Sequence, residues 1–154
     1  MFFDLFTFLI LLFFIAPVSL LFHEIGHAIG AKLVNASNIH ITLGIGKKVF
    51  EGSIIGIHIV IRQLIIINSI TSTFRDEPFR KYERILISIL GPGFSGIFAV
   101  IFYIAYYAII PAGTLYISFL FNLWLVFINL LPLKIGQKES DGYTICKLLY
   151  SKTL

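Results

Sequence analysis

Three long apolar stretches constrain the fold of this 154-residue chain more than any other feature. They run from about residue 5 to 33, from 85 to 110 and from 114 to 131. A helix needs about 20 apolar residues to cross the hydrocarbon core of a bilayer. Charged residues make up only 13% of the chain and the mean hydropathy is +0.94, whereas soluble domains are about a quarter charged. We therefore expect an α-helical integral membrane protein with three transmembrane helices.

The first apolar stretch is expected to be a retained helix and not a secretory signal. A signal peptide begins with basic residues and ends at a small-residue cleavage site. Residues 1–22 contain no Lys or Arg, include Asp4, and continue without a break into His23 and Glu24. These features favour a first span that stays in the mature protein.

The basic residues predict the orientation of the chain. Pro111, Ala112 and Gly113 are typical of a tight turn, which would join the second and third spans as an antiparallel hairpin. All twelve Lys and Arg lie at Lys32 or later, and none lies in that turn. Since basic loops stay on the cytoplasmic side, we expect a multi-pass protein of the cell membrane with its N-terminus outside and its C-terminus cytoplasmic. The sequence has no evident cluster of basic residues of the kind that binds nucleic acid, so we do not expect nucleic acid to be a partner.

The segment from about residue 39 to 70 has two interpretations. Ile57, Ile59 and Ile61 alternate with other residues, and such period-two alternation of β-branched residues favours strands. A fourth spanning helix is the rival, but it would place His58 and Arg62 in the middle of the bilayer. We expect a small β-sheet at the cytoplasmic face of the membrane, between the first and second helices. A solvated connector over 71–84 would follow, and the whole chain, 1–154, would form a single domain.

The sequence His23-Glu24-Ile25-Gly26-His27 is an H-E-x-x-H motif inside the first apolar stretch. Residues four apart lie on one face of a helix, so both imidazoles can bind one metal ion. Glu24, beside the first ligand, is in position to act as a base toward water activated by that ion. Ionisable side chains within a span are costly unless they are paired or bound. The pattern predicts a zinc site with Glu24 as the catalytic base, against the alternative of a satisfied set of core histidines.

Catalytic zinc usually has three protein ligands and one open position. His40 and His58 fall in the expected sheet and are interpreted as ordinary strand residues. Asp141 follows the third span, which runs toward the same side as the motif, and is the preferred third ligand. Glu139 is its near neighbour and the main competitor.

These residues together resemble the site-2 protease family of intramembrane zinc metalloproteases. The resemblance covers His23–His27, Gly91-Pro92 in the second span, Asn129-Leu130-Leu131-Pro132, and Asp141-Gly142, and so nearly the whole chain as a minimal three-helix core. It implies one Zn²⁺ ion bound by the two histidines and Asp141. It also implies a structural role for Gly91-Pro92 and a substrate contact for Asn129, for which bonding to a neighbouring helix is the alternative. Two departures stand out: Ser95 replaces a frequent asparagine, and 134–140 resembles an inserted polar loop.

The function expected from this resemblance is hydrolysis of a peptide bond near the cytoplasmic face of the bilayer. The substrate would be a transmembrane or membrane-associated protein or peptide, unwound locally because a helix hides its own backbone. Strand residues Val60–Ile66 are expected to pair with the extended substrate. The alternative is a catalytically inactive membrane binding protein of the same fold, which would have no need of Glu24. A metal channel would require ionisable residues in several spans, and the second and third have almost none.

Overall fold

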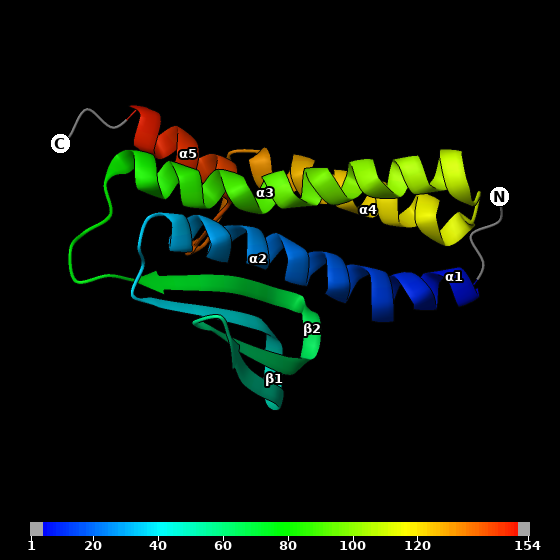
Figure 1. Ribbon diagram of the computed structural model, residues 1–154, viewed down its shortest axis with the longest axis horizontal. Helices are drawn as coiled ribbons and strands as arrows, with labels where there is room; N and C mark the ends of the chain where they lie inside the picture. The colour runs from blue at the N-terminus through cyan, green and yellow to red at the C-terminus, as the bar shows by residue number, and fades with distance from the viewer. Residues whose placement is uncertain (1–4, 151–154) are drawn as a thin grey trace.

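Three helices long and apolar enough to cross a membrane form the main body of the protein (Figure 1). The structure is a computed structural model that describes residues 5–150. Asp4 and Lys152, the last of the twelve basic residues, lie outside that range. The expectation of three apolar helices is confirmed, and they are compatible with a multi-pass membrane protein. Their bounds are Leu5–Leu33, Lys81–Ile109 and Gly113–Leu130.

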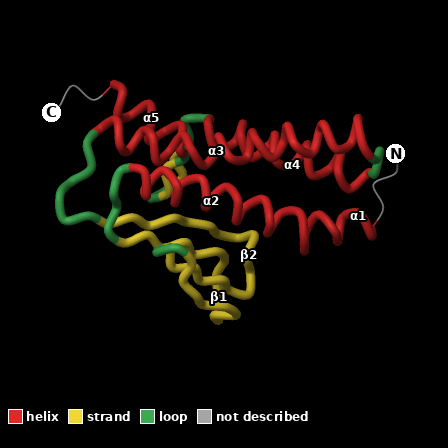
Figure 2. Tube along the Cα trace, viewed as in Figure 1, coloured by secondary structure: helices red, strands yellow, loops and turns green. Residues whose placement is uncertain are grey.

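Two of these long helices contain a π-helical turn. The first consists of α1 (Leu5–Ile10), a π turn (Leu11–Ile15) and α2 (Ala16–Leu33). The second is α3 (Lys81–Ile104) followed by a π turn (Ala105–Ile109), and the third is α4 (Gly113–Leu130). Figure 2 shows the long helices lying side by side, with the two long strands within residues 38–74 on the side of α2 opposite α3 and α4.

The second helix starts earlier than the sequence predicts, because its charged residues form a helix cap. Glu83 accepts a hydrogen bond from the backbone N–H of Arg80 (2.6 Å) and completes a capping box, a standard way to begin a helix. The same carboxylate pairs with the Arg75 guanidinium (2.8 Å). The expected connector over 71–84 is therefore wrong in its extent: it is only the short segment 75–80, between the last strand and α3.

A long hairpin separates the first and second helices, as predicted, and the alternative of a fourth spanning helix is wrong. Its strands are β1 (Asn38–Ile54) and β2 (Ile57–Phe74). Alternate residues Ile39, Ile41 and Leu43 are buried against Ala28 and Ala31 of α2. This packing places the sheet alongside the C-terminal half of α2 and not beyond the end of the helix (Figure 1).

The hairpin folds back on itself at two glycines. Gly44 (φ +87°) and Gly46 (φ +93°) adopt the left-handed backbone region that side chains disfavour. Because of this bend, residues 39–43 of β1 have partners on both flanks: Leu43, for example, lies beside Ser69 and beside Ile61. Residues 69–74 pair only with β1, so the other flank of this segment is a free edge within the described chain.

Small residues bring α2 and α3 into close contact. A Cβ atom added to Gly26 would lie 2.3 Å from the carbonyl oxygen of Leu90, and one added to Gly30 would lie 2.9 Å from Cα of Ile87. Such near approach of backbones is typical of helix pairs in membranes. It sets the face of α2 that bears the H-E-x-x-H motif directly against α3.

The C-terminal part differs from the expected inserted loop. Residues 134–140 contain a short hairpin, β3 (Lys134–Ile135) paired with β4 (Lys138–Glu139), and a further helix follows, α5 (Asp141–Tyr150). Gly142 packs so tightly that an added Cβ would lie 1.9 Å from the carbonyl oxygen of Leu130. This contact fixes the first turn of α5 against the end of α4.

Candidate metal centre

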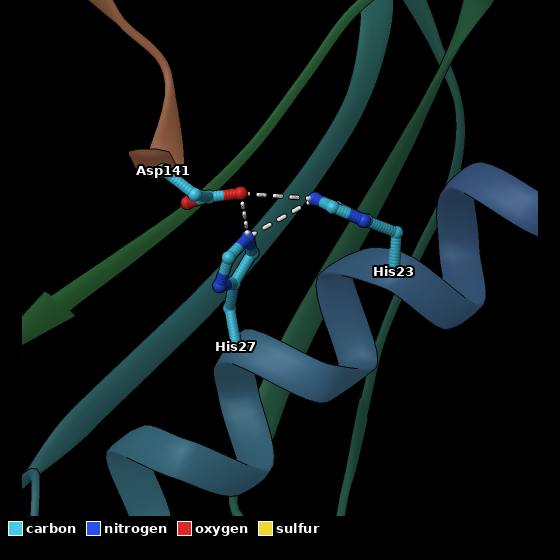
Figure 3. A group of neighbouring side chains, drawn as sticks. All are labelled: His23, His27 and Asp141. Carbon is cyan, nitrogen blue, oxygen red and sulfur yellow. Dashed lines mark hydrogen bonds and ion pairs between the residues drawn. The ribbon is translucent and has the colours of Figure 1, made fainter. Parts of the chain in front are cut away.

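His23, His27 and Asp141 converge at one point between α2 and the start of α5 (Figure 3). The Nε2 atoms of the two histidines are 3.2 Å apart, and each lies 3.4 Å from Oδ2 of Asp141. Both histidines are buried. Among the described residues, this is the one group of three or more His, Cys, Asp and Glu side chains arranged to hold a metal ion.

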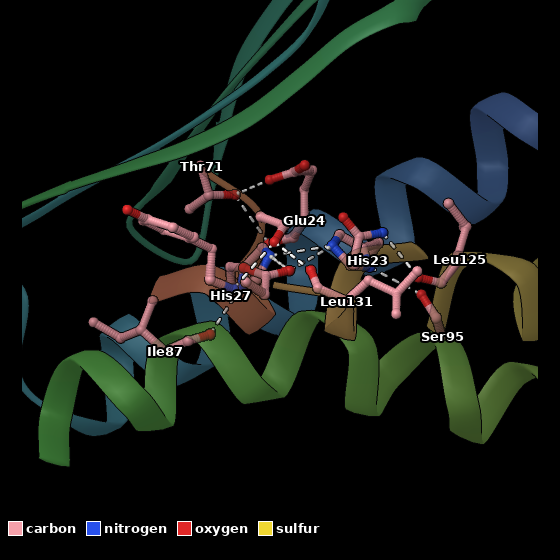
Figure 4. Close-up of polar contacts among 12 residues, drawn as sticks. His23, Glu24, His27, Thr71, Ile87, Ser95, Leu125 and Leu131 are labelled. Carbon is pink, nitrogen blue, oxygen red and sulfur yellow. Dashed lines mark hydrogen bonds and ion pairs between the residues drawn. The ribbon is translucent and has the colours of Figure 1, made fainter. Parts of the chain in front are cut away.

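Hydrogen bonds on the far side of each ring orient the two imidazoles. Nδ1 of His27 donates to the carbonyl oxygen of Ile87 (2.8 Å), which leaves the Nε2 lone pair of the neutral ring directed at the centre. Nδ1 of His23 lies 3.0 Å from the hydroxyl of Ser95, a fully buried residue of α3 (Figure 4). Partners of this kind fix the orientation of metal-binding histidines.

Pro92 interrupts the backbone hydrogen bonds of α3 beside the contact between His27 and Ile87. Pro92 sits inside α3 and has no N–H to donate to the carbonyl four residues earlier, that of Ser88. The preceding carbonyl, on Ile87, is the one that accepts from His27. Gly91-Pro92, for which the resemblance implies a structural role, thus lies where α3 contacts the second histidine.

The structure shows which of the two carboxylates, that of Asp141 or that of Glu139, lies beside the histidines. Glu139 forms ion pairs with Lys147 (3.0 Å) and Lys134 (3.1 Å) and not with the histidines. Hydrogen bonds from these two lysines, the one from Lys147 first, hold the pKa of Glu139 below its usual value. Oδ2 of Asp141, by contrast, lies 3.4 Å from Nε2 of each histidine. The carboxylate that the structure brings to the histidines is that of Asp141.

Glu24 lies on the same helix as the histidines and its side chain points toward β2 (Figure 4). It is only 4% exposed, and a buried carboxylate requires hydrogen-bond partners. Oε2 accepts a hydrogen bond of 2.6 Å from the hydroxyl of Thr71, which also lies 3.1 Å from the carbonyl oxygen of Glu24. The sheet therefore contributes directly to the surroundings of the motif.

A cavity of about 290 Å³ opens in front of these groups. It brings together the side chains predicted from the sequence as site residues with several that were not. Asn129 lies in its wall, and its Nδ2 donates to Leu125 O (2.9 Å) within its own helix, not to a neighbouring helix. The full lining is Leu20, His23, Glu24, His27, Ser69, Ile70, Thr71, Ile87, Ser88, Asn129, Glu139, Ser140 and Asp141.

His40 and His58 lie in the sheet, as expected, and away from the metal centre. They face each other across β1 and β2 with ring centroids 5.1 Å apart. His58 also contacts Glu51 (3.4 Å). Neither residue belongs to the group around Asp141.

Sequence reasoning missed the contacts of Ser95, Thr71 and Asn122. Ser95 follows Gly91 by one helical turn, and that spacing could have placed it on the face of α3 that meets α2. Asn122 is a fully buried amide within an apolar span that donates to Ser19 Oγ (2.9 Å), and a polar residue at such a position is itself a signal. No local pattern identifies Thr71, because its contact depends on the way the hairpin folds back.

A scan of the chain against models of known protein families finds no match, and a search of curated proteins finds no significant relative.

Proposed function

We propose that this protein is a zinc-dependent intramembrane endopeptidase of the site-2 protease type. The proposal depends on one observation: Asp141, at the start of α5, meets His23 and His27, which lie beside a buried Glu24 in a helix long and apolar enough to cross a membrane. Two imidazoles and a carboxylate form a ligand set that suits catalytic zinc, which leaves its fourth position open.

The size of the ligand triangle supports zinc as the ion. A tetrahedral zinc site with bonds of about 2.0–2.1 Å has ligand-to-ligand edges of about 3.3–3.4 Å. The three edges between Nε2, Nε2 and Oδ2 measure 3.2, 3.4 and 3.4 Å. When bound, zinc supplies Lewis acidity, which polarises a carbonyl group and makes water more acidic.

The proposed chemistry of the chain itself centres on Glu24. Its carboxylate takes a proton from the attacking water and returns it to the leaving amine. One oxygen, Oε2, is held by Thr71, which leaves Oε1 to accept that proton. Asn129, in the wall of the cavity, contacts the backbone of the substrate in this scheme.

The proposed substrate is a transmembrane or membrane-associated peptide in extended form, bound near the cytoplasmic face. Within the expected pairing segment Val60–Ile66, Val60 and Ile61 have strand partners on both flanks, and no residue of the segment lines the cavity. Residues 69–74 have a free edge, and Ser69–Thr71 line the cavity. Addition of a strand at a free edge is a common way to bind an extended peptide, so we assign this role to residues 69–74.

The test is cleavage of a panel of single-span membrane proteins, reconstituted in vesicles with the purified protein and zinc. Wild type is expected to cut at least one of them, and Glu24→Gln is expected to retain zinc but produce no cleavage. A protein that binds such spans without cutting any of them, with zinc present, would instead be a membrane binding protein of the same fold.

A further inference from the structure

Thr71 provides the connection between the free strand edge and the carboxylate of Glu24. Among the described residues, Thr71 is the one whose side chain hydrogen-bonds to this carboxylate, with its hydroxyl 2.6 Å from Oε2. Thr71 also lies in the segment 69–74, opposite Ile41 of β1. The residue therefore belongs both to the edge assigned to the substrate and to the surroundings of the base.

The geometry of the hydroxyl restricts what it can do. A threonine hydroxyl has one proton to donate, and a charged carboxylate is a stronger acceptor than a carbonyl group. The proton therefore goes to Oε2 of Glu24, and the nearby carbonyl oxygen at 3.1 Å makes the weaker contact. A β-branched side chain in a strand has little rotational freedom about χ1, so the hydroxyl holds Glu24 in one orientation.

We propose that Thr71 is a positioning residue that holds one oxygen of Glu24 so that the other faces the reacting water. This inference rests on the proposed function. It assigns the β-hairpin two roles at once: its edge binds the extended substrate, and a side chain of the same segment sets the direction of the base. Substrate that pairs with residues 69–74 is thereby placed in a fixed relation to the carboxylate, 47 positions away in sequence.

The experiment compares Thr71→Val with Thr71→Ser in the full-length protein. Valine keeps the shape and strand preference of threonine but lacks the hydroxyl. We expect Thr71→Val to lower kcat by about tenfold to a hundredfold, as misplacement of a catalytic group does, with KM changed less than about twofold and zinc content unchanged. Serine restores a hydroxyl at the same position and is expected to recover most of kcat.

Thr42→Val is the matched control, because it makes the same exchange on β1 outside the cavity, and it is expected to match wild type. Equal kcat for Thr71→Val and wild type would overturn the inference, as would a serine variant that is as slow as the valine variant. Absence of Glu24-dependent cleavage in wild type would instead overturn the proposed function. In that case the carboxylate band of isotope-labelled Glu24 still tests the contact, since it is expected to shift in Thr71→Val and not in Thr42→Val.

Discussion

The imidazole of His27 lies directly over Cα of Gly91, so close that a Cβ atom at residue 91 would be 2.2 Å from Cε1 and 2.3 Å from Nε2 of the ring. Gly91 therefore determines where the ring of His27 can lie in the candidate metal centre, although it is not one of the three residues of that group. It does so from α3, through its lack of a side chain.

Substitution of Gly91 by alanine is expected to displace His27 and remove the metal. Overpacking of this kind costs about 1–3 kcal/mol, and here the strain falls on the ligand itself. Zinc analysis of the purified variant is the measurement. Gly93→Ala is the control, since an added Cβ there meets nothing within 4 Å. Full zinc content in Gly91→Ala would contradict the packing described here.

The zinc content of two variants is expected to show whether Asp141 or Glu139 is the third ligand. Asp141→Asn should lose most of the bound zinc and all cleavage, because it removes the negative charge that faces both histidines. Glu139→Gln should retain zinc, because its partners are Lys134 and Lys147. The measurement is zinc per protein after dialysis against a weak chelator. The reverse result would assign the ligand to Glu139.

The contact of Lys138 with Asn68 joins the two walls of the cavity. Lys138 belongs to β4, and its ammonium group hydrogen-bonds to Oδ1 of Asn68 in β2. Each residue lies next to cavity-lining residues of its own strand, Glu139 and Ser69. This contact is worth about 0.5–1 kcal/mol. Its loss in Lys138→Ala is expected to widen the opening of the cavity. We expect kcat/KM for a membrane substrate to rise by about twofold to fivefold. Lys47→Ala removes the same charge at an exposed position and should leave kcat/KM unchanged. Equal kcat/KM in the two variants would rule out this role of the contact.

The buried amide of Asn122 is expected to stabilise the association of α4 with α2. Its Nδ2 donates to Ser19 Oγ on α2 and to the carbonyl oxygen of Ser118 on α4. Hydrogen bonds between membrane helices contribute about 0.6 kcal/mol on average and up to about 1.7. Asn122→Ala should lower the unfolding free energy in mixed micelles by an amount in that range. Leu120→Ala, at a largely exposed position of the same helix, is the comparison, and an equally large loss there would argue against a specific bond.

The sequence was sufficient to predict the parts of this protein that depend on local pattern. Continuous apolar stretches predicted the three helices, alternation at Ile57, Ile59 and Ile61 predicted the sheet, and the four-residue spacing of His23 and His27 predicted that they would face the same way. Each of these patterns is complete within one element, so no knowledge of the tertiary structure was required.

The features that escaped prediction depend on contacts between distant segments. The fold-back at Gly44 and Gly46 gives residues 57–61 partners on both flanks and leaves a free edge at residues 69–74, and the sequence predicted neither feature. The early start of α3 depends on Glu83, whose charge was interpreted as a sign of a loop but caps a helix and pairs with Arg75. The preference for Asp141 over Glu139 was made from the sequence, but its physical reason was not: Glu139, in the hairpin of β3 and β4, forms ion pairs with two lysines.

The candidate metal centre joins two histidines of α2 to Asp141, which opens α5, more than a hundred residues later in the sequence. During synthesis, a nascent chain that already has α2 in the bilayer thus possesses two histidines and a base but not the third donor. If the proposed function holds, the ribosome must have synthesised the chain at least as far as Asp141 before the zinc site can be complete.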